Sequence, residues 1–191
     1  MHQQQQWDPE AYTSARTRRL RLAAVLGGLV AVAVVVWLVT RGGDDSSSHE
    51  SLAPEAVTPA ALSQFAGSRS TPVYWAGEQA GATLELSEYE DGRVYVRYLT
   101  GGAKPGSSSS EFLTVGTYEF AEPVAALEKL SNQAGGVRRT IPGGGIAYFN
   151  RNSPQNVYVA YPGVEAQIEV YDPDPGRATE LATSGQIVPI S

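Results

Sequence analysis

The sequence contains no cysteine, so disulfide bonds, thiolate nucleophiles and cysteine-ligated metal sites are excluded. Histidine is nearly as scarce, because the two histidines, His2 and His49, both precede the region that we predict to fold. That region therefore has no imidazole for a Ser-His-Asp triad or for a zinc site. We accordingly predict no catalytic residues, no cofactor-binding residues, no metal ligands and no cofactor.

Lysine is also rare, with only Lys104 and Lys129, and the charges are unevenly distributed. The first 43 residues carry five arginines against Asp8 and Glu10, whereas the rest of the chain carries nine basic and eighteen acidic residues. Proteins bind the phosphate backbone of a nucleic acid through clusters of Lys and Arg, which an acidic domain lacks. We therefore predict that nucleic acid is not a partner.

One long apolar run, from Leu22 to Thr40, contains no charged side chain. A helix over this run spans about 28 Å, close to the ~30 Å hydrocarbon core of a bilayer. The sequence RTRRLR precedes the run and RGGDD follows it, which predicts a cytoplasmic N-terminus because Lys and Arg are retained on that side. We predict a single-pass cell-membrane protein that contacts the bilayer through Leu22 to Thr40. A cleaved signal peptide is the alternative, but WLVTRGG is a poor cleavage site.

The membrane helix divides the chain into predicted parts. Residues 1–21 form a cytoplasmic arm that is too short to bury a core, and we predict that it is disordered. Residues 22–40 form the membrane helix. Residues 41–57 are rich in Gly, Ser and Asp and form a flexible tether. Residues 58–191 form one extracytoplasmic domain.

Hydrophobic periodicity in that domain predicts an α+β fold with an antiparallel sheet. The strongest hairpin signal is Asp91-Gly92 between two β-rich runs. Strands and hairpins are predicted over residues 71–77, 83–99, 112–120, 137–142, 145–163, 164–171 and 186–190. The tract Gly101–Ser110, which is rich in Gly and Ser, is predicted to be a mobile loop.

Three helices are predicted where a capping side chain or a first-turn proline marks a start. The first begins at Thr58 and ends near Gly67, and the second begins at Pro123 with Leu127 and Leu130 on its buried stripe. The third follows DPDPGR. The order of elements then suggests two similar β-β-β-α halves with the helices on one face of the sheet, and chance similarity is the alternative.

The motif YDPDPGR contains two aspartates that could be interpreted as calcium ligands. Asp172 and Asp174 lack the further oxygen ligands and the terminal Glu that an EF-hand loop requires. Asp174 precedes Pro175, a combination that is typical of a helix N-cap followed by a first-turn proline. We therefore predict a cap and not a metal site.

Tyrosine is the feature that favours molecular recognition, since nine of the ten tyrosines follow residue 70. A tyrosine combines an apolar ring with a hydroxyl group, which suits a binding surface as well as a half-buried strand. The i, i+3 spacing places Tyr95 and Tyr98 on opposite strand faces, and likewise Tyr158 and Tyr161. Packing in the core is the alternative role. The predicted ligand surface for a peptide or glycan consists of Trp75, Tyr95, Tyr98, Tyr158 and Tyr161.

The segments TPVYWAGE, YVRYL, LTVGTYEF and AQIEVYDPDPGRATELATSGQIVPI carry a resemblance that covers Thr71 to Ser191. Their pattern resembles uncharacterised single-pass membrane proteins of actinobacterial type. The resemblance implies a small extracytoplasmic α+β domain. It implies no catalytic residue, because that family has no assigned activity.

Three hypotheses of function follow from these patterns. The favoured one is a non-enzymatic binding or envelope-interaction module whose partner is an envelope protein, a peptide or a glycan. The second is a carboxylate-dependent hydrolase acting on cell-wall material, which requires Glu85 or Glu119 to converge with Glu169 in a cleft. The third is a sensor that signals inward through residues 1–15.

Overall fold

The computed structural model of the chain describes residues 53–191. The predicted cytoplasmic arm, the predicted membrane helix and the predicted tether up to residue 52 lie outside the described residues. Within residues 53–191, no helix has the length and apolar character needed to cross a bilayer. Membrane insertion and orientation therefore stay predictions.

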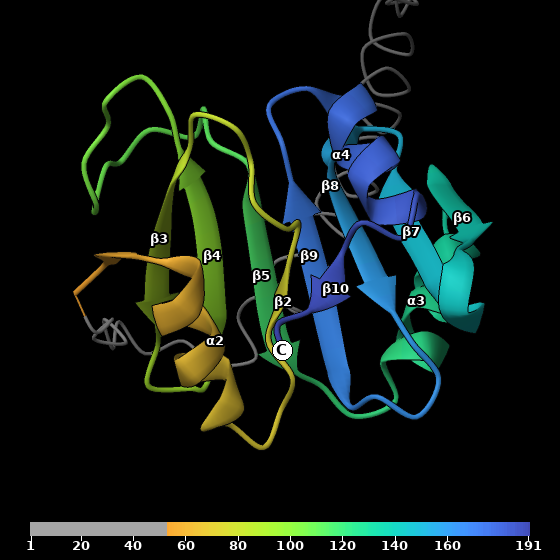
Figure 1. Cartoon of the computed structure of the whole chain (residues 1–191). Coiled ribbons are helices and arrows are strands. Elements are labelled where there is room, and N and C mark those ends of the chain that lie inside the picture. The colour runs from red at the N-terminus through yellow and green to blue at the C-terminus, as the bar shows by residue number, and fades with distance from the viewer. Residues whose placement is uncertain (1–52) are drawn as a thin grey trace, which may run out of the picture. The chain divides into compact units, whose positions relative to one another are not determined.

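Eight strands form one antiparallel sheet, and two short strands form a separate pair (Figure 1). The order across the large sheet is β1-β3-β4-β5-β9-β8-β7-β6, and β10 pairs with β2. The strands are β1 (Glu55–Val57), β2 (Tyr74–Trp75), β3 (Thr83–Glu88), β4 (Val94–Leu99), β5 (Thr114–Glu119), β6 (Gly136–Thr140), β7 (Ile146–Asn150), β8 (Ser153–Ala160), β9 (Ala166–Tyr171) and β10 (Val188–Pro189). The helices are α2 (Pro59–Gly67), α3 (Pro123–Ser131), α4 (Pro175–Thr183) and the 3-10 turn η1 (Pro142–Gly144). The predicted α+β class with an antiparallel sheet is confirmed.

The sheet begins earlier than the predicted start of the domain at Thr58. Strand β1 pairs with β3, with Glu55 opposite Leu86 and Val57 opposite Leu84. The last three residues of the predicted tether therefore belong to the sheet. Thr58 then caps α2 as predicted, since its hydroxyl accepts a hydrogen bond from the Ala61 amide at 3.2 Å.

A hairpin turn and a helix cap lie where the sequence predicts them. Strands β3 and β4 form a hairpin around Asp91-Gly92, where Gly92 has φ +84°, a conformation that glycine adopts without steric cost. Asp174 is the N-cap of α4, because its Oδ1 accepts a hydrogen bond from the Gly176 amide at 2.8 Å. The cap that was predicted in place of a calcium ligand is thus confirmed.

Side chains alternate between the two faces of the large sheet, and one of these faces is here called the packed face. Its core contains Val96, Val115, Val159 and Val170, none of which is exposed to solvent. Helices α2 and α4 and the β2–β10 pair cover this face and lie in front of the sheet in Figure 1. These elements and the residues that flank β2 and β10 contribute Leu62, Ala66, Val73, Tyr74, Ala178, Leu181, Ala182 and Ile187 to the core.

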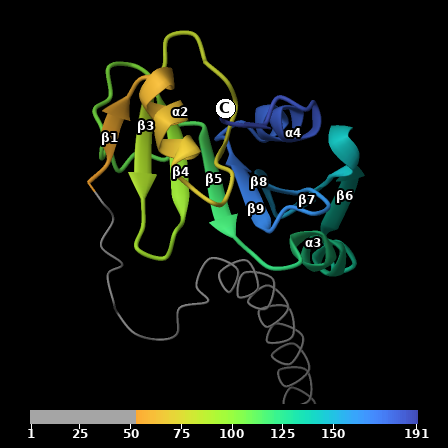
Figure 2. The same ribbon diagram turned by 60° about the horizontal axis from the view of Figure 1, so that its bottom comes forward.

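The opposite face, here called the tyrosine face, is covered only in part by a described helix. Helix α3 packs there against β6, β7 and β8, on the other side of the sheet from α2 and α4 (Figure 2). Leu127 and Leu130 are buried as predicted, and Glu128 forms an ion pair with Arg138 of β6 at 2.9 Å. Strands β3 and β4 carry no described helix on this face.

The predicted placement of all helices on one face is therefore wrong. The tyrosine face of β7 and β8 carries the large rings of Tyr148 and Tyr158, which are only 2% and 3% exposed. Burying rings of this size is favourable in proportion to the apolar area removed from water. Helix α3, which lies in the connection between β5 and β6, supplies that cover.

Candidate functional site

Five residues in register cross the tyrosine face on five neighbouring strands. Tyr95 of β4 is opposite Gly116 of β5, and Gly116 is opposite Glu169 of β9. Glu169 is in turn opposite Tyr158 of β8, which is opposite Tyr148 of β7. Because residues opposite each other point to the same face, a partly buried carboxylate lies in the middle of a line of phenols.

Tyr118 fills the gap that Gly116 leaves in this line. A Cβ atom on Gly116 would lie 2.9 Å from the Tyr118 hydroxyl oxygen and 3.1 Å from Cε1 of Tyr95. The rings of Tyr95 and Tyr118 meet edge to face, with centroids 5.7 Å apart. The tyrosine row is here defined by its side chains as Tyr95, Tyr118, Glu169, Tyr158 and Tyr148.

Glu169 accepts the hydrogen bonds of two phenols within the tyrosine row. The Tyr118 hydroxyl donates to Oε2 of Glu169, and the Tyr158 hydroxyl donates to the same carboxyl group. Burial raises the pKa of Glu169 above its ordinary value, and the two hydrogen bonds act in the opposite direction. Burial and the Glu169 charge both raise the pKa of Tyr118 and of Tyr158. The phenols therefore stay protonated as donors at neutral pH.

Replacing Glu169 with glutamine is expected to remove one pH-dependent contribution to the free energy of unfolding. The folded-state pKa of Glu169 is raised from 4.5, so the folded protein holds this proton to a higher pH than the unfolded chain does. The wild-type protein accordingly loses stability as the pH rises from about 4.5 through the raised pKa. The glutamine variant lacks this loss.

Thermal unfolding of the full-length wild type and of Glu169→Gln, purified in a mild detergent, measures this difference between pH 4 and pH 7. The free energy of unfolding can change by at most about 2.303RT per pH unit for one proton. The stability of the variant relative to the wild type should increase with pH. A difference that stays constant or decreases with pH would show that the carboxyl group is not destabilised by burial.

The other end of the tyrosine face contains an ion pair between neighbouring strands. Glu85 of β3 and Arg97 of β4 are opposite each other, and Nη1 of Arg97 donates to Oε1 of Glu85 at 2.7 Å. The Glu85 side chain is not exposed at all, whereas that of Arg97 is 19% exposed. The amide of Gly106 donates to the second carboxylate oxygen at 2.6 Å. Glu85 is therefore paired at both oxygens, as a buried charge requires.

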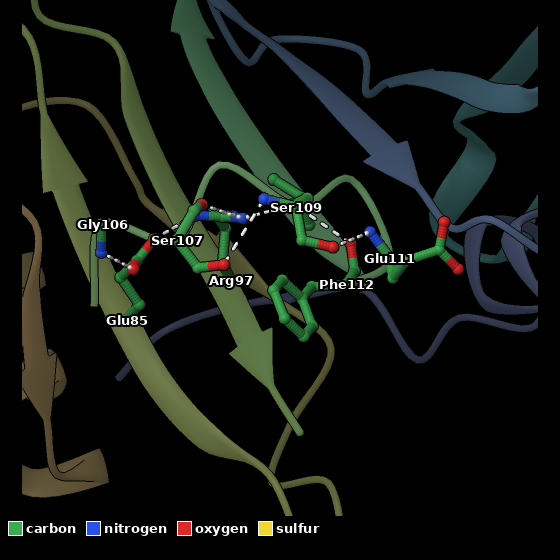
Figure 3. A network of polar contacts seen from close by, with 8 residues as sticks. Glu85, Arg97, Gly106, Ser107, Ser109, Glu111 and Phe112 are labelled. Atoms are coloured by element: carbon green, nitrogen blue, oxygen red, sulfur yellow. Dashed lines mark hydrogen bonds and ion pairs between the residues drawn. The ribbon is translucent and has the colours of Figure 1, made fainter. Parts of the chain in front are cut away.

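Arg97 also holds the β4–β5 loop, as Figure 3 shows. Its Nη2 donates to the carbonyl oxygens of Ser107 and Ser109, at 3.0 and 2.8 Å. The guanidinium carbon lies 5.4 Å from the centre of the Phe112 ring, within the range of a cation–π contact. The loop that was predicted to be mobile, Gly101–Ser110, is thus attached to the sheet at Gly106, Ser107 and Ser109, whose backbone groups bind the side chains of Glu85 and Arg97.

A hollow of about 320 Å³ lies between this loop and the tyrosine row. Here called the tyrosine hollow, it is lined by Pro54, Glu85, Ser87, Tyr89, Tyr95, Arg97, Gly106 and Ser107. The rings of Tyr89 and Tyr95 meet at an angle of 72° with centroids 5.4 Å apart, and both residues are partly exposed. The hollow thus joins aromatic surface to convergent polar groups, next to residues with shifted pKa values, which is typical of a binding site.

The structure divides the five residues of the predicted ligand surface between the two faces. Tyr95 and Tyr158 are in the tyrosine row, and Tyr158 is buried. Tyr98 is buried on the packed face, where its hydroxyl accepts a hydrogen bond from the Ala76 amide at 2.7 Å. Tyr161 stacks on Tyr74, and Trp75 of β2 pairs with β10. Of the five, only Tyr95 reaches the tyrosine hollow.

The acids of the hydrolase hypothesis do not converge. Strands β4 and β5 separate Glu85 from Glu169, so the two backbones lie ~14 Å apart. Their carboxyl groups also have different partners, Arg97 and Gly106 for Glu85 and Tyr118 and Tyr158 for Glu169. Glu119 follows Tyr118 on β5, and alternation directs it to the side opposite Glu169. Two catalytic carboxyl groups of a glycosidase must lie within ~10 Å of each other on one cleft. Residues 53–191 also contain no group of three or more acidic or histidine side chains placed to hold a metal ion.

Comparison with protein-family models, with curated proteins and with solved structures found no match. The resemblance to actinobacterial single-pass membrane proteins therefore stays a prediction.

Several residues of the tyrosine hollow and row were not singled out from the sequence, among them Tyr89, Arg97, Tyr118 and Tyr148. A signal for Arg97 was present, because the hairpin centred on Asp91 places it close to Glu85 on the same face. No such local signal exists for Tyr118, whose position depends on Gly116 and on pairing with β9.

Proposed function

We propose that the chain is a membrane-anchored extracytoplasmic module that binds an uncharged, hydroxyl-rich ligand, a glycan segment of the cell envelope, in the tyrosine hollow. The observation that carries this proposal is the lining of the hollow. Tyr89 and Tyr95 are partly exposed there beside a Glu85–Arg97 pair whose charges balance.

The chemistry of these side chains supports a glycan over a charged ligand. Tyrosine rings offer flat apolar surfaces to the C–H faces of a sugar. The hydroxyl groups of Ser87 and Tyr95 both donate and accept hydrogen bonds, as sugar hydroxyls do. The lining carries one acidic and one basic side chain, so its net charge attracts neither anions nor cations. A hollow of about 320 Å³ is at the small end of ligand sites and suits a short glycan segment.

Attachment to the membrane supports the same proposal, because it would keep the domain at a high effective concentration of envelope ligands. The predicted helix Leu22–Thr40 and the predicted tether would hold the domain outside the cell, close to the envelope. Tethering a binding module raises the effective concentration of its ligand, so that weak contacts in a small hollow suffice. Non-enzymatic binding is favoured because the acids of the hydrolase hypothesis are apart.

Replacing Tyr89 with alanine is expected to weaken the binding of glycan fragments released from isolated cell envelopes by about tenfold or more. The ring forms one wall of the hollow, and a tenfold loss equals ~1.4 kcal/mol. Titration calorimetry with the full-length protein in detergent measures the effect. Tyr161→Ala is the matched control, because it removes a ring of the same kind outside the hollow. Equal losses in both variants, or absence of binding by the wild type, would refute the proposal.

We also propose that the large sheet arose by duplication of one unit, so that its two halves are similar. The strand order β1-β3-β4-β5 is mirrored by β6-β7-β8-β9 about the β5–β9 pair, and the tyrosine row crosses that junction. The helices do not follow the symmetry, since α3 and α4 lie on opposite faces. Superposition of the two halves tests the idea, and failure of the strands to align in chain order would refute it.

A further inference from the structure

A second and larger hollow, of about 1030 Å³, lies where three connections meet at one end of the sheet. These are the segment before β2, the β5–α3 connection and the β8–β9 turn. Its apolar lining includes Phe120, Tyr161, Pro162 and Val164. Here called the glutamate hollow, it shares no residue with the tyrosine hollow. It is therefore a separate candidate site.

The charge of the glutamate hollow has one sign. Glu119, Glu122 and Glu165 line it, and its lining contains no Lys, Arg or His. All three glutamates are exposed, and within residues 53–191 none of them forms an ion pair. The Glu119 carboxylate accepts a hydrogen bond from the Thr71 hydroxyl at 2.5 Å. A positively charged group would therefore meet uncompensated negative potential.

Backbone and ring contacts join the segments that line the hollow. The Phe120 amide donates to the carbonyl oxygen of Glu165 at 3.1 Å, which joins the β5–α3 connection to the β8–β9 turn. Glu122 has φ +53° and is the only described residue other than glycine with a positive φ. The ring of Tyr161 is stacked on Tyr74 with centroids 6.0 Å apart. The backbone link and the stacked Tyr161 ring therefore lose little conformational freedom when a ligand binds.

We propose that the glutamate hollow docks an extended basic peptide segment of another envelope protein. One or two Lys or Arg side chains of the segment meet Glu119, Glu122 and Glu165, and the apolar residues between them pack against Phe120 and Tyr161. The volume is at the upper limit of small-molecule sites, so it accommodates several residues of a peptide. A basic peptide satisfies both the apolar lining and the negative charge, whereas a purely apolar segment leaves the carboxylates unpaired.

A fluorescent short peptide with two lysines among prolines and leucines is the probe, and the same peptide with glutamine in place of lysine is its counterpart. Anisotropy with the full-length protein in a nonionic detergent measures binding. The lysine peptide is expected to bind about tenfold more tightly than the glutamine peptide, and less tightly at high salt. Equal binding of the two peptides, or no binding of the lysine peptide, would overturn the proposal.

The double variant Glu122→Gln/Glu165→Gln is expected to lose about tenfold in affinity for the lysine peptide, because two of the three exposed charges are removed. Glu111→Gln/Glu180→Gln is the matched control. It removes the same charge from two exposed glutamates outside the hollow and should bind as the wild type does. Equal losses in both double variants would mean that only the net charge of the domain attracts the peptide.

Tyr89→Ala separates this proposal from the glycan proposal. It changes the tyrosine hollow only, so the lysine peptide should bind to it as to the wild type. A loss of peptide affinity in Tyr89→Ala would place the peptide in the tyrosine hollow and overturn the assignment to the glutamate hollow.

Discussion

Replacing Arg97 with alanine is expected to lower the free energy of unfolding by about 3 kcal/mol. The variant leaves the carboxylate of Glu85 buried without its ion-pair partner, and the side chain of Glu85 has no exposed surface. It also removes the donors to Ser107 and Ser109, so the β4–β5 loop loses its attachment to the sheet. Thermal unfolding of the full-length protein in detergent should show a midpoint lower by roughly 10 °C.

An exposed ion pair provides the control for this prediction. Arg138 and Glu128 form a contact of similar length, 2.9 Å, but their side chains are 50% and 49% exposed. Removing a partner of such a pair costs less than about 1 kcal/mol. The midpoint of thermal unfolding of Arg138→Ala should therefore be close to that of the wild type. If Arg97→Ala and Arg138→Ala were equally stable, burial of Glu85 would have no energetic consequence.

The double variant Glu85→Leu/Arg97→Met tests the cause of the loss. It removes both charges and keeps side chains of similar size on the same face. Replacement of a buried ion pair by apolar residues is often nearly neutral, so this variant should recover most of the stability lost in Arg97→Ala. A double variant as unstable as the single one would assign the effect to the loop contacts alone.

Elements of this fold that depend on local signals were predictable from the sequence. The hairpin around Asp91-Gly92 and the caps at Thr58 and Asp174 each depend on a few neighbouring residues. The pairing of β5 with β9 joins residues about fifty positions apart, and no local pattern specifies it. The face that α3 covers was mispredicted for the same reason, because it depends on which strands lie beside β5.

The candidate site shows the same division. Tyr95 and Tyr158 were predicted as ligand residues because tyrosine is enriched in recognition surfaces, but only Tyr95 lines the tyrosine hollow. The role of Tyr158 as a donor to Glu169 required the β8–β9 register. The anchoring of the β4–β5 loop also escaped prediction, because its Gly and Ser content indicates flexibility and does not reveal the Arg97 contacts.

Replacing Gly116 with alanine is expected to lower the free energy of unfolding by about 1–3 kcal/mol, the usual cost of overpacking. The new Cβ atom would lie 2.9 Å from the Tyr118 hydroxyl oxygen and 3.1 Å from Cε1 of Tyr95. Tyr118 is only 7% exposed and is bonded to Glu169, so the ring cannot move aside without breaking that hydrogen bond. The variant should therefore also disturb the Glu169 environment.

Gly67→Ala is the matched control, because a Cβ atom on Gly67 would have no neighbour within 4 Å and the residue has no positive φ. At the end of α2, alanine should be neutral or slightly stabilising. Unfolding curves of the two variants at pH 4 and pH 7 separate the effects: Gly116→Ala should lose stability at both values and change its pH dependence, whereas Gly67→Ala should follow the wild type. If Gly116→Ala were as stable as Gly67→Ala, the tyrosine row would tolerate a side chain at its centre, and the close packing around Glu169 would not contribute to stability.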